Sequence, residues 1–172
     1  MTDTVKNALL REMEAYFDGD TRRIEHARKV TAYAEQLLEE ETGDYAIVIG
    51  AAVLHDIGIH QAEKKYGSSI GRYQEIEGPP VARPILEKLG FEQGQIDEIC
   101  QIIANHHSPG KINTPNFRIL YDADWLVNLK DEYDIQNRSK LKNIIDRVFL
   151  TASGKSLARA LYLAETEQQE EP

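Results

Sequence analysis

The segment Tyr45–Ile57 is apolar throughout, except for a His and an adjacent Asp near its end. Such a segment has no polar face to turn toward water, so it predicts a central helix that neighbouring helices bury on all sides. His55 and Asp56 are then carried into the interior, where an ionised carboxylate is costly unless another group compensates it. A divalent cation provides that compensation, because imidazole nitrogen and carboxylate oxygen both bind such ions.

The other apolar residues recur at helical spacing, and no segment alternates as a strand would. We therefore expect an all-α fold, a single-domain bundle of about six to eight helices over residues 1–172. An N-terminal helix is expected over residues 4–17, and C-terminal helices over residues 135–167 that end in an acidic tail. Residues 58–78 contain glycines without clear periodicity and predict a long loop with room for one short helix, before a helix that starts at Pro79.

Three further metal-competent side chains project from apolar stripes of separate predicted helices: His26, His106 and Asp124. Helices that direct nitrogen and oxygen ligands into one bundle interior are a recurrent way to build a metal site. Asp122 lies on a less apolar face, which favours Asp124 of the two. A single His on such a stripe has the alternative role of a core residue bonded to a carbonyl, but the whole set predicts a metal site.

In chain order the candidates read His26, His55-Asp56 and Asp124, with the central doublet in the form HDIG. This order resembles the H…HD…D pattern of the HD-domain superfamily of metal-dependent phosphohydrolases, over a metal-site core of about residues 22–129. The resemblance implies an HD-type helical bundle that binds a divalent metal ion, one of Mn, Ni, Co, Fe, Zn or Mg. The ligands that it implies are His26, His55, Asp56 and Asp124.

The resemblance also bears on a second metal ion. Binuclear members add a His before a Gly in the middle of the chain, followed by one or two later His. Here Glu77 precedes Gly78 at the middle position, and His106 and His107 match the later ones. Glu can replace His as an oxygen ligand, although it favours harder metals. The alternative role of Glu77 is that of a carboxylate at a helix N-terminus, so the number of metal ions stays open.

The activity implied is hydrolysis of a phosphoester or phosphoanhydride, in a nucleotide or another small phosphorylated substrate, by metal-activated water. Asp56 would bind the metal and help to orient that water. Arg23 precedes His26 by three residues and can offer two N–H groups to a phosphate from the same helix face. Further candidate substrate contacts are Lys64, Lys65 and Arg72. The alternative role of all these cations is solvation at the surface.

The amino-acid composition bears on the binding partners and the cellular location of the protein. The formal charge of −9 argues against binding of long nucleic acids, which depends on Lys and Arg releasing counterions from phosphates. Cys100 is the only cysteine, and no secretory signal or membrane-spanning segment is apparent, so we expect a cytoplasmic protein without an internal disulfide.

Two other functions stay open from the sequence. Some HD proteins are di-iron oxygenases, which keep the ligands but use dioxygen to cleave C–C or C–P bonds. The fold can also serve as a non-catalytic, nucleotide-binding regulatory module with a structural metal. An intact ligand set weighs against this last alternative, because a structural role needs no open coordination position.

Overall fold

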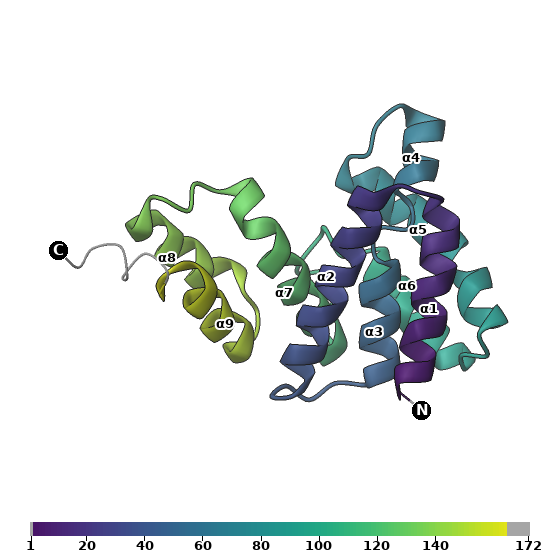
Figure 1. Ribbon diagram of the computed structural model, residues 1–172, viewed down its shortest axis with the longest axis horizontal. Helices are drawn as coiled ribbons and strands as arrows, with labels where there is room; N and C mark the ends of the chain where they lie inside the picture. The colour runs from purple at the N-terminus through teal and green to yellow at the C-terminus, as the bar shows by residue number, and fades with distance from the viewer. Residues whose placement is uncertain (1, 165–172) are drawn as a thin grey trace.

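The computed structural model describes residues 2–164, and the regular structure in this range is entirely helical (Figure 1). The all-α, single-domain fold expected from the sequence is confirmed. The acidic tail and the end of the expected 135–167 region lie outside the described residues. The helices of the described range are α1 (Thr2–Phe17), α2 (Thr21–Leu38), α3 (Tyr45–Leu54), α4 (Ile59–Tyr66), α5 (Gly71–Lys88), α6 (Gln93–Ile103), α7 (Pro115–Glu132), α8 (Arg138–Val148) and α9 (Ala152–Tyr162).

Helix α3 lies at the centre of the bundle and packs against α1, α2, α6 and α7. Its residues from Ile47 to Leu54 are all buried, so that no face over this length meets solvent. Asp44 caps the start of the helix by accepting a hydrogen bond from the Ile47 N–H at 3.1 Å. The predicted central helix is therefore confirmed, and its C-terminal end delivers His55 and Asp56 to the interior.

The segment 58–78 is mostly helical rather than a loop. Helix α4 occupies its first part, and α5 begins at Gly71, so the start expected at Pro79 is wrong. Three prolines, at positions 79, 80 and 84, lie inside α5. Each proline lacks the N–H that would bond the carbonyl four residues earlier, so local sequence alone argues against this helix.

Tertiary packing holds α5 in place despite its prolines. A Cβ atom placed on Gly58, in the turn after α3, would lie only 2.5 Å from the backbone nitrogen of Gly78 in α5. A Cβ on Gly78 would in turn lie 2.5 Å from a side-chain carbon of Ile103 in α6. The two glycines thus allow α5 to pack directly against the turn that carries the His-Asp pair.

Helices α8 and α9 pack against each other, and α9 packs on α7 and hydrogen-bonds to Glu41 after α2, at the left of Figure 1. The ligand-bearing helices α2, α3 and α7 form the opposite part of the bundle with α1, α5 and α6. Helices α8 and α9 therefore lie on the side of α7 that faces away from α1, α5 and α6.

One segment, Tyr45–Tyr66, is long and apolar enough to cross a membrane by length and composition, and 72% of its most apolar window is buried inside the structure. The segment comprises α3 and α4. The core helix of a soluble protein has the same composition, so the central position of α3 accounts for it.

We predict that Gly58→Ala destabilises the metal-free protein by about 1–3 kcal/mol, because the new methyl group would overlap the backbone of α5. The matched control is Gly94→Ala in the first turn of α6, where a Cβ meets nothing within 4 Å. That change should leave stability equal or raise it by up to about 1 kcal/mol. Urea denaturation followed by circular dichroism measures both, and an unaltered midpoint for Gly58→Ala would contradict the close contact.

Candidate metal centre

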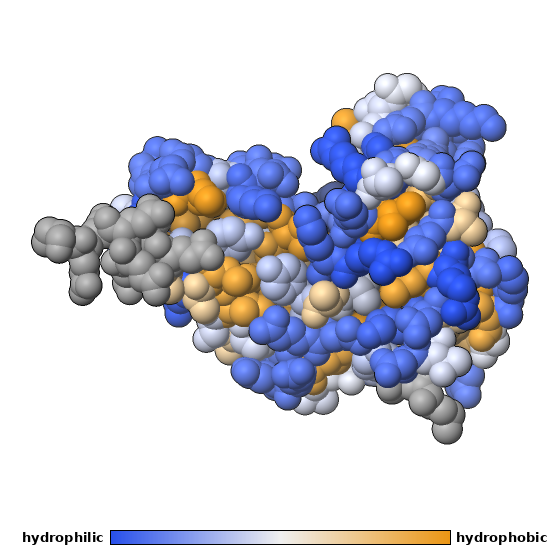
Figure 2. All heavy atoms as spheres, in the orientation of Figure 1, coloured by the Kyte–Doolittle hydropathy of each residue, from blue (hydrophilic) through white to orange (hydrophobic). Residues whose placement is uncertain are grey.

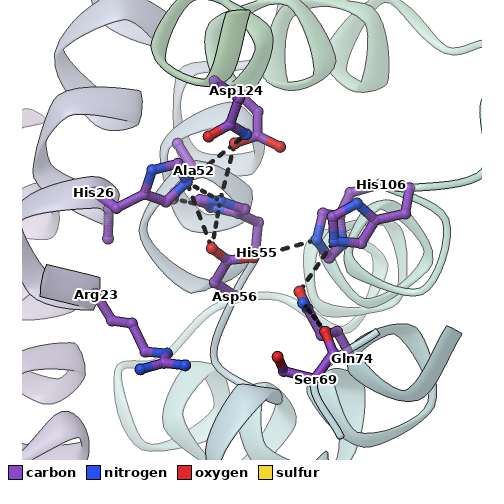
Figure 3. A network of polar contacts seen from close by, with 12 residues as sticks. Arg23, His26, Ala52, His55, Asp56, Ser69, Gln74, His106 and Asp124 are labelled. Atoms are coloured by element: carbon purple, nitrogen blue, oxygen red, sulfur yellow. Dashed lines mark hydrogen bonds and ion pairs between the residues drawn. The ribbon is translucent and has the colours of Figure 1, made fainter. Parts of the chain in front are cut away.

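Four helices bring the candidate ligands together beside the C-terminal end of α3 (Figure 3). His26 projects from α2 and Asp124 from α7, although 98 positions separate them in the chain. His55 and Asp56 follow the last residue of α3 directly, and His106 lies just beyond the end of α6. The convergence predicted from helical spacing is therefore present.

The polar atoms of this group lie at distances suited to a shared cation. His26 Nε2 is 3.2 Å from His55 Nε2 and 3.1 Å from Asp124 Oδ1. Asp56 Oδ2 lies 3.3 Å from His55 Nε2 and 3.4 Å from His26 Nε2. Ligand atoms about 2.1 Å from one metal ion, in octahedral or tetrahedral geometry, are about 3.0–3.4 Å apart. The four side chains match that spacing.

Backbone carbonyls orient two of the rings so that a neutral His would turn the lone pair of Nε2 toward a metal ion. His55 Nδ1 donates to the Ala52 carbonyl at 2.8 Å, and His106 Nδ1 donates to the Ile103 carbonyl at 2.7 Å. This geometry assigns the proton of the neutral ring to Nδ1 and leaves a lone pair on Nε2. His106 Nε2 is buried and has no hydrogen-bond partner among the described residues. A buried lone pair without a donor fits a bound cation.

The histidine and aspartate side chains at the centre shift one another's pKa values. Burial opposes ionisation of Asp56, but the imidazoles of His55 and His106 outweigh it and hold the Asp56 pKa well below its usual range. The pKa of Asp124 is lowered in the same way, chiefly by His55 and His26 against the effect of burial. Burial likewise opposes protonation of His55, yet the two carboxylates raise its pKa well above 6.5. Both carboxylates are therefore ionised and attract a cation.

A second group of potential ligands adjoins the first and shares Asp56. His106 Nε2 lies 3.4 Å from Asp56 Oδ1, the oxygen that does not contact His55 and His26. Asp56, His106 and His107 offer ligand atoms within 4.8 Å of one another. Asp56 thus turns one oxygen toward each group, which is the arrangement of a bridging carboxylate. Burial, reinforced by the nearby His106, lowers the pKa of His107 to about 4, so its ring is neutral at pH 7.

Gln74 of α5 completes this second group, and sequence reasoning missed it. Its side-chain oxygen accepts from His107 Nε2 at 3.0 Å, while its amide nitrogen donates to the Ser69 carbonyl at 2.5 Å. The amide is therefore oriented, and the proton of His107 is held on Nε2, which leaves Nδ1 as the ligand atom. No signal in the sequence marks Gln74, because α5 was not predicted at this position.

Glu77 does not join the second group. Its carboxylate accepts hydrogen bonds from Lys65 Nζ at 2.6 Å and from the Tyr66 hydroxyl at 3.0 Å. These donors, Lys65 first and opposed by partial burial, lower the pKa of Glu77. Glu77 instead ties α5 to the end of α4, and it lies inside α5 rather than at a helix N-terminus. In this structure Glu77 thus forms an ion pair with Lys65, and is neither part of the second ligand group nor a carboxylate at a helix N-terminus.

Asp122 and Asp124 point to different places, although only one residue separates them. Asp122 is buried and accepts hydrogen bonds from the backbone N–H groups of Leu150 and Thr151, both at 2.8 Å, and from the Thr151 hydroxyl at 2.6 Å. Burial raises its pKa to about 6, against the effect of these donors. Asp122 anchors the start of α9, whereas Asp124 faces the metal centre, as the apolar stripe predicted.

Four of the candidate ligands line a cavity of about 750 Å³ together with Arg23, namely His26, Asp56, His107 and Asp124. The Arg23 guanidinium donates to Asp20 at 3.0 Å and to Glu63 at 2.6 Å, so it is held between α2 and α4. The other cations proposed from the sequence, Lys64, Lys65 and Arg72, are not among the described residues that line the cavity. The cations that do line it with Arg23 are Arg22, Lys29 and Lys130.

Asn128 is the other residue that sequence reasoning missed. It follows Asp124 by one helical turn and donates its amide to Asp124 Oδ1 at 2.8 Å. The i,i+4 spacing was a usable signal, because it places both side chains on one face of α7. This hydrogen bond fixes the rotamer of Asp124 at the wall of the cavity.

We predict opposite effects from changes at the two neighbouring aspartates. Asp124→Asn should weaken metal binding at least about 100-fold, because an anionic ligand is lost. Asp122→Ala should lower the free energy of unfolding by about 3 kcal/mol, because it leaves buried donors without an acceptor, and should leave metal affinity within about threefold. Calorimetric metal titration and urea denaturation of the metal-free proteins separate the two effects. Loss of metal binding in Asp122→Ala at unchanged stability would contradict the assignment.

We predict that Gln74→Leu weakens metal binding at the second group by about 10–100-fold, because His107 loses the acceptor that sets its tautomer. Gln74→Glu, which keeps an acceptor of similar size, is the matched control and should bind nearly as wild type does. Calorimetric titration of the metal-stripped protein with Mn²⁺ measures metal binding at the second group. A Gln74→Leu isotherm that superimposes on that of wild type would rule out this role.

Comparisons with known proteins agree with the geometry. The family model described as HD domain matches residues 23–129, more than half of the chain. No match is found among curated proteins. A predicted HD superfamily hydrolase from an uncultured Thermotogales bacterium has a TM-score of 0.65 at 24% identity, over 97% of this chain and 89% of its own. An HD-superfamily hydrolase from Bacillus thuringiensis has a TM-score of 0.67 at 20% identity, over 98% of this chain and 96% of its own.

At these identities the two crystal structures show a shared fold and nothing finer. The family match is more informative, because its range contains every side chain of the two ligand groups, from His26 to Asp124. On the match and the ligand geometry together, this chain belongs to the HD-domain family.

Proposed function

We propose that this protein is a metal-dependent phosphohydrolase. It would cleave a phosphoester or phosphoanhydride in a small phosphorylated compound, with nucleotides as the class suggested by the sequence. The main support for the proposal is the pair of candidate ligand groups that share Asp56. Asp56 lines the same cavity as Arg23. Membership of a family of metal-dependent proteins also supports the proposal, as does the likeness to folds described as hydrolases.

A divalent cation at these ligands would polarise a phosphate oxygen and lower the pKa of a water molecule. Asp56 would act as a shared ligand and accept a hydrogen bond from the attacking water. Because a carboxylate bound to a cation is a weak base, the contribution of Asp56 would be orientation rather than proton abstraction. His107, neutral at pH 7, would serve in the same way as a ligand rather than as an acid.

Arg23 would bind the phosphate. Asp20 and Glu63 each take one N–H group of its guanidinium, so that the group is immobilised while other N–H donors stay available. The two carboxylates also offset part of its charge. Arg23 therefore suits one phosphoryl group held in a defined orientation.

We also propose that the partner is a small phosphorylated substrate and that neither long nucleic acid nor a membrane is involved. The formal charge of −9 supports the exclusion of long nucleic acid. A cytoplasmic location stays a prediction from the single cysteine.

The test is phosphate release from a panel of small phosphate esters and anhydrides. The protein is stripped of metal with a chelator and reloaded with Mn, Ni, Co, Fe, Zn or Mg in turn. We predict turnover that depends on the metal and falls to background in Asp56→Ala, because the shared ligand is lost. Asp3→Ala, at an exposed position of α1, is the control and should retain full activity.

The same experiment separates the alternatives. Oxygen consumption with two bound irons and no phosphate release would favour a di-iron oxygenase, a second candidate that the two adjoining ligand groups keep open. Tight nucleotide binding without product under all metals would favour a regulatory module. Either result would overturn the phosphohydrolase proposal.

A further inference from the structure

The cavity extends well beyond the metal ligands, and the residues along this outer part bear on the substrate. Figure 2 shows this face hollowed between α7 and the α4–α5 hairpin, with mainly hydrophilic residues around the hollow. The outer wall is formed by the first turns of α2 and the last turns of α7. The only aliphatic side chains among the described residues that line the whole cavity are Ile59 and Val127. The outer cavity is therefore a polar surface.

Aromatic side chains are absent from the described residues that line the cavity, His apart. Proteins hold a nucleobase largely by stacking it on Phe, Tyr or Trp, or on a free guanidinium plane. Tyr66 and Tyr73, which are not among the described residues that line the cavity, instead stack on each other with ring centroids 4.1 Å apart. Arg23 is held by two carboxylates. The described lining of the cavity thus offers no aromatic platform for a base.

Charge in the outer cavity is balanced rather than positive. Arg22, Lys29 and Lys130 are its cations, and three carboxylates face the same space. Arg23, nearer the metal ligands, is already paired with Asp20 and Glu63. A single phosphoryl group can be neutralised at the metal centre, but the further phosphates of a di- or triphosphate would meet no excess of cations. The carboxylates concerned are Glu25, Asp131 and Glu132.

The same residues suit hydroxyl groups. Carboxylates accept hydrogen bonds from hydroxyls, and ionised acceptors make the stronger ones. Asn128 donates its amide to Asp124, which orients its side-chain oxygen as a further fixed acceptor at the wall. Lysine and arginine supply donors beside them. A wall of hydrogen-bond acceptors and donors, without an apolar or aromatic surface, is complementary to a compound that carries several hydroxyls.

We infer that the site takes the monophosphate ester of a small polyhydroxylated compound, a sugar or polyol phosphate, in preference to nucleotides. This inference rests on the proposed phosphohydrolase function and narrows its substrate class. The phosphoryl group lies at the ligand groups and Arg23, and the hydroxyls lie against Glu25, Asn128 and Asp131. The inference departs from the nucleotide class suggested by the sequence, because the described wall that would bind a base or extra phosphates has neither aromatic rings nor surplus cations.

Ribose 5-phosphate and AMP give a matched test, since AMP is the same phosphorylated sugar with a base attached. For the metal-loaded protein we expect kcat/KM for ribose 5-phosphate to exceed that for AMP at least about tenfold, and AMP to exceed ATP. A ratio of ribose 5-phosphate to AMP below ten overturns the inference but leaves the phosphohydrolase proposal standing. Absence of turnover with every compound and metal overturns the phosphohydrolase proposal itself. In that case calorimetric binding decides the inference, and AMP binding as tightly as ribose 5-phosphate rejects it.

A double variant, Glu25→Gln with Asp131→Asn, gives a signature that structural damage would not produce. Loss of the two charged acceptors should raise KM for ribose 5-phosphate about tenfold, and removal of their negative charge should raise kcat/KM for ATP. Glu39→Gln, exposed at the other end of α2, is the matched control and should change neither value. Equal shifts of both substrates in the same direction would contradict the assigned wall.

Discussion

The structure depends on one electrostatic constraint, the burial of unprotonated ring nitrogens and ionised carboxylates at one point. His55 and His106 each commit Nδ1 to a backbone carbonyl, so their remaining nitrogens present lone pairs to the carboxylates of Asp56 and Asp124. Such a set repels itself in a low-dielectric interior unless a proton or a cation intervenes. In the metal-free protein a raised pKa at His55 partly meets that need. A divalent cation would meet it fully, which is why the same residues suit both a stable fold and a reactive centre.

The helices are arranged to satisfy this constraint. Helix α3 must be buried because it is apolar on every face, and its end therefore carries the His-Asp pair inward. Gly58 and Gly78 then let α5 pack close behind that pair, which brings Gln74 within reach of His107. The contact also explains why α5 persists through three prolines, since close tertiary packing outweighs the lost helical hydrogen bonds.

Much of the metal centre could be predicted because its residues lie on regular helices or just beyond their ends. His26 and Asp124 sit on apolar stripes whose period fixes which face is buried, and the HDIG sequence marks the end of α3. The main error lies in the segment 58–78, where the glycines and the prolines that follow at 79 and 80 hid the start of α5 at Gly71. Glu77 was therefore assigned a role that depends on a local geometry it does not have, and its carboxylate pairs with Lys65 instead. Gln74 was missed for the same reason.

The sequence by itself determined the all-α class and the central helix, because hydrophobic periodicity is a local property of helices, and the order of His and Asp along the chain indicated four candidate ligands. Only the tertiary structure decided that Asp56 faces both ligand groups, that Gln74 orients His107 and that the cavity wall comes from α2 and α7. These features depend on how helices distant in the chain pack together. Spacing along one helix cannot specify which residue of another helix will face it across a gap of a few ångströms.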